Sequence, residues 1–155
     1  MNFKSLIQEV ESSDEFKKWK ETHKEYFLAH IFNVDQGTSW QIGYSDGEKA
    51  STFTLNPISV EDSDELTKRP EVKVLHLNID KLTLDYEKAM DLFNNLLKEK
   101  HPKEQIFKKI IIIQNIDNKE MYNITGLTHT FKTLNVKIDM NGNIIEDSLV
   151  ALMQQ

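Results

Sequence analysis

The chain contains no cysteine and no long apolar run. Without cysteine it can form no internal disulfide, offers no thiolate nucleophile and cannot hold a cysteine-ligated zinc ion or iron–sulfur cluster. The compartment stays open, because many exported proteins also lack cysteine. The longest aliphatic run, Ile110 to Ile113, is far too short to cross a membrane. Cysteine chemistry is therefore excluded, and no membrane span is predicted.

Catalytic motifs are also missing. The sequence has no Gly-x-Ser-x-Gly, no glycine-rich phosphate loop and no His-Glu-x-x-His. Its five histidines are scattered, and none is spaced from another as metal ligands are. These histidines are His23, His30, His76, His101 and His129. His30 lies within an apolar segment, which favours a core or interface position. We therefore predict no catalytic, metal-binding or cofactor-binding residues and no cofactor; an enzyme that uses carboxylates or histidine alone is the least favoured alternative.

Two acidic stretches suggest metal binding but are better explained otherwise. The run Glu61 to Glu65 lacks repeated ligand spacing, so a solvated loop is the favoured interpretation. In Asp139-Met-Asn-Gly-Asn143 the glycine is at the fourth place, whereas a calcium loop has it at the sixth. A turn at Asn141-Gly142 explains that pattern.

The charge balance argues against nucleic acid as a partner. Lysine and arginine number 19 and aspartate and glutamate 25, so the net charge is −6. This acidity favours solubility and opposes binding to nucleic acid or an anionic membrane. The N-terminal residues show neither the apolar core nor the cleavage site of a secretion signal. We expect a cytoplasmic protein, with export after loss of a signal as the open alternative.

The first half of the chain predicts helix followed by strands. Phe3, Leu6, Ile7 and Val10 recur at helical spacing, and Phe16, Trp19 and His23 continue the pattern. Ser12-Ser13 can cap a second helix, so one helix or two both fit. Strands are predicted at 26–34, 40–44 and 51–55, with turns at 35–38 and at Asp46-Gly47.

The middle of the chain is predicted to be irregular. Residues 56–70 contain two prolines and the acidic run, so this stretch is the best linker candidate. Apolar residues between 72 and 79 suggest an extended segment after it.

The second half repeats the order of helix and strands. Thr83 is expected to cap the longest helix, which His101-Pro102 ends. Ile106 to Ile116 is almost continuously apolar, as in a central strand covered on both faces. Further strands are predicted around 122–125 and 133–139, and a short closing helix at 149–153.

The strand at 133–139 has one polar face. Leu134, Val136 and Ile138 point one way, and Thr133, Asn135 and Lys137 point the other. We expect these three polar residues to face a protein or peptide partner.

The repeated order predicts an α+β fold built from two αβββ units, with helices packed on antiparallel β-sheet. The first unit covers residues 1–56, an acidic linker and extended segment covers 57–82, and the second unit covers 83–155. At 155 residues the two units fit one compact domain with a shared core.

The second half resembles the PepSY-like domains. The resemblance covers about Thr83 to Ile145, and the first half would be a diverged tandem copy. It rests on Leu84-Asp-Tyr-Glu-Lys-Ala-Met90 opening a helix, His101-Pro102 closing it, Tyr122-Asn-Ile-Thr125 in a strand, and Phe131 to Ile144 as a final strand ending in Asp-Met-Asn-Gly. The resemblance implies a non-catalytic α+β module of PepSY-like or cystatin-like architecture. Such domains occur with protease propeptides and cell-surface proteins and are thought to regulate peptidases, although no peptidase domain is seen in this chain.

Two functions follow as hypotheses. The first is a non-enzymatic binding or regulatory module, which modulates a peptidase or binds another protein. The alternative is a carrier of a small apolar ligand, with a pocket near Trp40, Tyr44 and Tyr86; core packing also explains these aromatic residues. Edge strands would additionally allow the chain to form a homo-oligomer.

Overall fold

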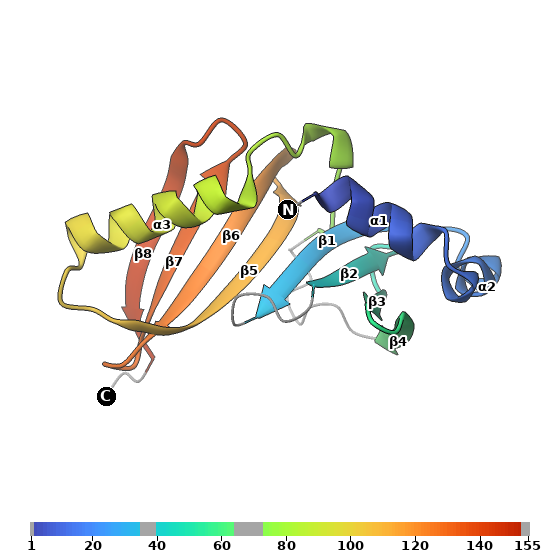
Figure 1. The fold of residues 1–155 in the computed structure, drawn as a ribbon, viewed down its shortest axis with the longest axis horizontal. Helices are drawn as coiled ribbons and strands as arrows, with labels where there is room; N and C mark the ends of the chain where they lie inside the picture. The colour runs from blue at the N-terminus through green and yellow to red at the C-terminus, as the bar shows by residue number, and fades with distance from the viewer. Residues whose placement is uncertain (1, 35–39, 64–72, 153–155) are drawn as a thin grey trace.

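Eight strands form one antiparallel sheet in the order β4-β3-β2-β1-β5-β6-β7-β8 (Figure 1). The structure is a computed structural model that describes residues 2–34, 40–63 and 73–152. Its strands are β1 Phe27–Val34, β2 Trp40–Ser45, β3 Ala50–Thr54, β4 Ser59–Ser63, β5 Ile106–Ile116, β6 Lys119–Thr128, β7 Lys132–Asp139 and β8 Ile144–Ala151. Its helices are α1 Phe3–Glu11, α2 Asp14–Thr22, α3 Tyr86–Lys100 and the short 3-10 helix η1 Ile79–Lys81. The predicted mixture of helices with an antiparallel sheet is confirmed.

The N-terminal helical segment is two helices. The Ser13 hydroxyl accepts a hydrogen bond from the backbone N–H of Phe16, at 3.1 Å, and so caps α2. Asn2 caps α1 in the same way, through the N–H of Ser5. Each side chain satisfies a backbone donor that the first turn leaves free, which is why the break falls at Ser12-Ser13.

The long helix starts later than predicted. Asp85, in an extended conformation, is the residue before α3, and Thr83 does not cap it. The Thr83 hydroxyl instead donates to the carbonyl of Met140, at 3.4 Å. The helix ends at Lys100, before His101-Pro102, as expected from the restriction that proline places on the preceding residue.

Each half of the chain contributes four strands to the sheet, where the sequence predicted three. In the first half the additional strand is β4, within the stretch predicted to be a linker. All five residues of β4 are exposed. An edge strand with exposed side chains needs no apolar face, so the acidic run shows no strand pattern in the sequence. Its carboxylates discourage pairing with a further strand.

In the second half the additional strand is β8, which ends at Ala151 and replaces the helix predicted at 149–153; residue 153 lies outside the described residues. Leu149 pairs with Leu134 of β7, and Val150 pairs with Thr133. The apolar residues near the C-terminus fit both a helical and an extended spacing, and the turn at Asn141-Gly142 decides between them by returning the chain along β7. Gly142 supplies the positive φ of 85° that this turn requires.

The segment from 73 to 78 fills the space where β1 and β5 diverge. These strands pair only from His30 to Val34 and from Ile110 to Gln114. Beyond that point the N–H of Leu77 donates to the carbonyl of Leu28, at 2.9 Å. The predicted extended segment therefore makes one backbone hydrogen bond to β1 before η1 but forms no strand. The predicted turn at 35–38 and the stretch 64–72 lie outside the described residues.

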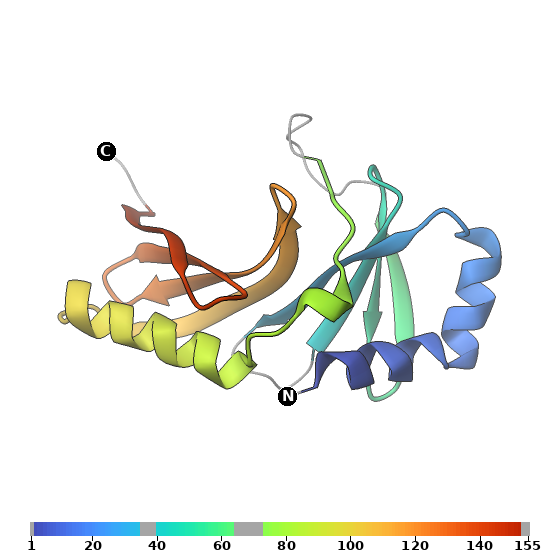
Figure 2. The ribbon, with the colours of Figure 1, turned by 90° about the horizontal axis from the view of Figure 1, so that it is seen from above.

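The helices all pack on one face of the sheet. Figure 1 shows α3 crossing the strands of the second half and α1 crossing β1 and β2, and Figure 2 shows both helices on the same side. The aromatic rings of α2 reach that face as well, since Phe16 lies 5.5 Å from the ring of Phe53. Strand β5 is central, but only Ile111 and Ile113 are fully buried; Ile110 and Ile112 are half-buried. The strand is central as predicted, but the expectation that it is covered on both faces is wrong for the described residues. No helix in the described part of the chain is long and apolar enough to cross a membrane.

Candidate binding face

The sheet face opposite the helices, here called the open face, carries the most extended polar arrangement in the described residues. Strand register places its residues in rows across the sheet. One row contains Ile112, Asn123, Lys137 and Glu146, and the next contains Ile110, Thr125, Asn135 and Ser148. Their neighbours along each strand, such as Ile111 and Ile124, point to the helices and are fully buried. Alternation along the strands therefore assigns these rows to the open face.

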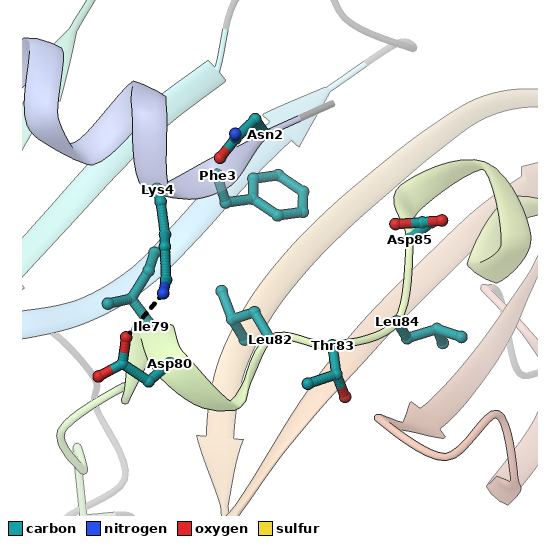
Figure 3. A pocket seen from close by; sticks show the side chains of 9 residues that line it. All are labelled: Asn2, Phe3, Lys4, Ile79, Asp80, Leu82, Thr83, Leu84 and Asp85. Atoms are coloured by element: carbon teal, nitrogen blue, oxygen red, sulfur yellow. Dashed lines mark ion pairs between the residues drawn. The ribbon is translucent and has the colours of Figure 1, made fainter.

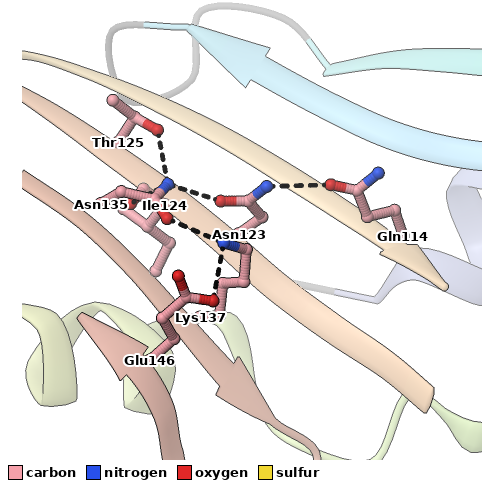
Figure 4. A network of polar contacts seen from close by, with 7 residues as sticks. All are labelled: Gln114, Asn123, Ile124, Thr125, Asn135, Lys137 and Glu146. Carbon is pink, nitrogen blue, oxygen red and sulfur yellow. Dashed lines mark hydrogen bonds and ion pairs between the residues drawn. The ribbon is translucent and has the colours of Figure 1, made fainter. Parts of the chain in front are cut away.

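Four side chains on this face form a continuous hydrogen-bonded chain, here called the relay (Figure 4). Lys137 Nζ donates to Asn135 Oδ1 at 3.2 Å. Asn135 Nδ2 donates to Asn123 Oδ1 at 2.7 Å, and Asn123 Nδ2 donates to Gln114 Oε1 at 3.0 Å. The relay thus runs from β7 through β6 to β5 and links three strands by side chains alone.

Glu146 on β8 holds the far end of the relay. Its carboxylate lies 3.1 Å from Lys137 Nζ, with the lysine side chain 23% exposed and the glutamate side chain 59% exposed. A pair with this exposure contributes little to stability, roughly 0–1 kcal/mol. Its effect is positional, because it fixes the lysine beside Asn135.

The lysine also fixes the direction of every amide in the relay. An ammonium group can only donate, so Asn135 must present its oxygen to Lys137 and its nitrogen to Asn123. The same constraint passes to Asn123 and then to Gln114. Each amide oxygen is used within the relay, whereas Gln114 Nε2 has no hydrogen-bond partner among the described residues.

The sequence-predicted partner-facing residues are partly brought together. Asn135 and Lys137 belong to the relay. Thr133 lies one row further, opposite Leu127 and Val150, and its side chain makes no hydrogen bond to a described residue. Gln114, Asn123 and Glu146 were not predicted. Each of the three falls at a polar position of its own strand, so the pattern within that strand does not single it out. Only the register between strands shows that they lie beside Asn135 and Lys137.

The open face continues onto β1 through a histidine. His30 pairs with Gln114 across the β1–β5 boundary, and its ring lies directly over Gly43 of β2. Burial lowers the pKa of His30, so the imidazole is neutral at physiological pH. His30 was predicted to lie in the core or at an interface, and the structure places it half-buried on the open face.

An apolar floor lies beside the relay. Phe32 is directly opposite Ile112, and Val34 is directly opposite Ile110, all four half-buried on the open face. Ile112 in turn is the row neighbour of Asn123. The face therefore combines branched and aromatic surface with a line of polar groups, which is the usual composition of recognition surfaces.

The predicted apolar pocket residues lie in the core on the helix face. Trp40 is 6% exposed and its ring meets that of Tyr86 edge-on, at 5.3 Å. Tyr44 is 2% exposed and packs instead against Phe16, while its hydroxyl donates to Glu11, at 2.8 Å. The structure brings Trp40 and Tyr86 together and places Tyr44 in a neighbouring aromatic cluster.

A cavity of about 390 Å³ opens elsewhere on the helix side (Figure 3). It lies between the start of α1, η1 and the approach to α3. An ion pair between Lys4 and Asp80, at 2.9 Å, stands at its rim, and both side chains are exposed. Its lining residues are Asn2, Phe3, Lys4, Ile79, Asp80, Leu82, Thr83, Leu84 and Asp85. None of the three aromatic residues predicted for a pocket lines it.

The chemistry available on the open face is binding chemistry. Amides, a hydroxyl and a lysine paired with a glutamate donate and accept hydrogen bonds, and side-chain amides do not ionise near neutral pH. Within the described residues, no group of three or more histidine, aspartate or glutamate side chains is arranged to hold a metal ion. The open face therefore presents side chains that can form hydrogen bonds.

Comparisons with known proteins bear on the fold. No protein-family model matches the chain, and no curated protein matches it. Among solved structures it is similar to the crystal structure of a "putative lipoprotein" from Clostridium difficile 630, with a TM-score of 0.51 and 15% sequence identity. The similarity covers 88% of this chain and 90% of that chain. At this identity the likeness concerns the arrangement of helices and strands alone.

Proposed function

We propose that this protein is a non-enzymatic binding module that engages a protein or peptide through the open face of its sheet. The observation that carries the proposal is the relay, which aligns hydrogen-bonding groups of Lys137, Asn135, Asn123 and Gln114 across three strands. Side chains held in this way lose little conformational freedom when a partner binds, so their contacts cost less entropy.

We further propose that the two halves are copies of one PepSY-like unit. The mirrored strand order supports this, because β1 and β5 lie together at the centre and β2–β4 and β6–β8 extend outward in chain order. Each half also begins with helix and continues as an antiparallel meander. The family resemblance then suggests a peptidase as the first class of partner to test.

Site-specific photo-crosslinking tests the proposed face. A photoreactive residue at Thr133 would sit beside the relay without breaking any of its hydrogen bonds. The matched control places it at Lys88, an exposed residue of α3 on the opposite side. We expect one partner to crosslink from position 133 and not from position 88, and to be lost when Lys137→Met removes the end of the relay. Equal crosslinking from both positions would contradict the proposal.

The cavity beside η1 supports carriage of a small ligand as the second candidate function. Its volume of about 390 Å³ falls within the range of small-molecule sites, and Phe3 and Leu84 give it an apolar floor. A thermal-shift screen tests this, because a ligand that binds only the folded chain must raise the melting temperature. The shift should disappear in Leu82→Trp, which fills the cavity, and persist in Lys137→Met.

A further inference from the structure

The relay leaves unused hydrogen-bond donors on the open face. Both N–H groups of Asn135 are engaged, by Asn123 Oδ1 and by Thr125 Oγ1 at 2.9 Å. Gln114 keeps two free N–H groups, Asn123 keeps one, and the hydroxyl hydrogen of Thr125 is free among the described residues. Each amide oxygen accepts one bond and keeps a second lone pair, so the amides alone do not decide between a partner that donates and one that accepts.

A lysine without a carboxylate partner favours a partner that accepts hydrogen bonds. Lys108 lies on the open face, opposite Leu127 and one row beyond Ile110. It makes no ion pair with a described residue, whereas Lys137 is neutralised by Glu146. Asp139, at the end of β7, keeps its negative charge, but it accepts hydrogen bonds from the backbone of its own turn and has Lys119 as a neighbouring positive charge. Lys108 is therefore left as an uncompensated positive charge on this part of the face, although the net charge of the chain is −6.

We propose that the open face recognises a partner segment that carries carboxylates beside apolar side chains. The inference rests on the proposed function and specifies the chemistry of the partner. Carboxylates would accept hydrogen bonds from Gln114, Asn123 and Lys108. The apolar side chains would cover Phe32, Ile110 and Ile112, which border these donors. A negative charge introduced on this face would meet the carboxylates of such a partner, and like charges placed side by side are strongly unfavourable.

Gln114 is the residue on which the proposal can be tested most sharply. Gln114→Glu keeps an oxygen to accept from Asn123, preserves the shape of the side chain, and replaces the two free donors by a negative charge. A partner that brings carboxylates must then lose affinity. Lys88→Glu is the control: a positive charge becomes a negative one on the opposite side of the sheet, so the chain becomes more acidic than in Gln114→Glu without a change to the open face.

The first experiment selects random twelve-residue peptides from a display library on immobilised wild-type protein. The second measures fluorescence anisotropy with one selected peptide and its counterpart in which every Glu and Asp is replaced by Gln and Asn. We expect the selected peptides to be acidic with apolar positions, the neutral counterpart to bind at least tenfold more weakly, and Gln114→Glu to weaken binding by about tenfold or more. Lys88→Glu should change binding by less than twofold.

Three outcomes would overturn the inference: selection of neutral or basic peptides, equal binding by Gln114→Glu, or no enrichment above a variant carrying Asn135→Leu and Lys137→Met. Circular dichroism and the melting temperature of each variant ensure that a loss of binding does not reflect unfolding. The crosslinking experiment decides the proposed function separately. A partner that crosslinks at position 133 but shows no preference for carboxylates would leave the binding face intact and remove only this inference.

Discussion

The hydroxyl of Tyr122 donates a hydrogen bond to the backbone carbonyl of Leu84, at 2.6 Å, and thereby ties β6 to the segment that leads into α3. Both residues are buried, and 38 positions separate them in the sequence. Burial, with the charges of Asp85 and Glu87, raises the pKa of Tyr122, so the hydroxyl stays protonated and able to donate.

We expect Tyr122→Phe to lower the free energy of unfolding by about 1–2 kcal/mol, because it leaves a buried carbonyl without a donor. Urea denaturation followed by tryptophan fluorescence measures the change. Tyr86→Phe is the matched control: Tyr86 is half-buried and its hydroxyl has no hydrogen bond to a described residue, so its removal should cost less than about 0.5 kcal/mol. Similar losses in both variants would show that the bond to Leu84 is not the cause.

Gly43 is required where the ring of His30 crosses β2. A Cβ atom at this position would overlap the ring atoms of His30. We expect Gly43→Ala to destabilise the protein by about 1–3 kcal/mol through overpacking. The double variant with His30→Ala should recover part of that loss, which a double-mutant cycle measures as a coupling energy. A Gly43→Ala variant with wild-type stability would show that the ring can move aside without cost.

Lys109 is a buried lysine on the helix side of the sheet. Its Nζ donates to Asn94 Oδ1 at 3.0 Å and lies 5.2 Å from the centre of the Phe93 ring, with no carboxylate of the described residues in ion-pair range. Burial lowers the pKa of Lys109 below its ordinary 10.5. The folded state therefore disfavours the charged amine, and this buried lysine lowers the free energy of unfolding.

We expect Lys109→Met to raise the free energy of unfolding by about 1 kcal/mol at pH 7, because it removes a poorly compensated charge and keeps the volume. The advantage of the variant should shrink as the pH rises through the lowered pKa toward 10.5, since wild-type Lys109 then becomes neutral in the folded state. Urea titrations between pH 7 and 10 test this, with Lys108→Met as the exposed-side control. A difference that grows with pH would contradict the assignment.

The sequence was sufficient to predict the strands whose apolar residues are buried in the structure. The apolar run of β5 and the alternation of β7 predicted those strands, because burial on one or both faces dictates such patterns. The sequence pattern did not predict β4 and β8, which are the two edge strands of the sheet. An edge strand is exposed on one side and needs little apolar content, so Glu61 and Asp62 suggested a linker although they lie in a strand.

The candidate site was predictable only in part for a related reason. Alternation within β7 was enough to put Asn135 and Lys137 on one face. The pairing of Asn123 with Gln114 depends on how β6 aligns with β5, and register is a property of two distant segments. The same limit applies to Tyr44, which shares a strand face with Trp40 but packs against a different helix.

The turn between β7 and β8 depends on one carboxylate. Asp139 Oδ1 accepts from the backbone N–H groups of Asn141 and Asn143, each at 2.9 Å. Burial alone would raise the pKa of Asp139, but the bonds from Asn143 and Asn141 outweigh it and hold the pKa below 3.8. The carboxylate therefore contributes stability that is fully present above pH 3.8 and is lost as the pH falls through the lowered value.

We expect Asp139→Ala to cost about 1–2 kcal/mol at neutral pH, in line with the loss of a side chain that caps backbone donors. The difference from the wild type should narrow below pH 4, as wild-type Asp139 becomes protonated. Asp91→Ala, at an exposed position of α3, is the control for removing a carboxylate outside the turn. A constant difference for Asp139→Ala down to pH 2 would show that the carboxylate charge is irrelevant to the turn.

The two edges of the sheet differ in how well they resist pairing. Strand β4 exposes Glu61 and Asp62 along five residues, as protected edges do. Strand β8 is eight residues long, and its two acidic side chains are engaged by Lys137 and by Lys100 of α3. Apolar side chains remain exposed at both of its ends: Ile145 is 49% exposed and Val150 is 48% exposed.

We therefore expect any self-association of the protein to proceed through β8, because its free backbone groups and exposed apolar ends favour addition of a strand. Sedimentation velocity at rising protein concentration measures it. Val150→Lys places a charge on the open edge and should reduce the associated fraction severalfold, whereas Val60→Lys on β4 should leave it unchanged. If both substitutions reduce association equally, net charge and not the edge controls it. If Val60→Lys alone reduces it, the acidic edge is the pairing edge, and exposed apolar surface does not decide which strand is used.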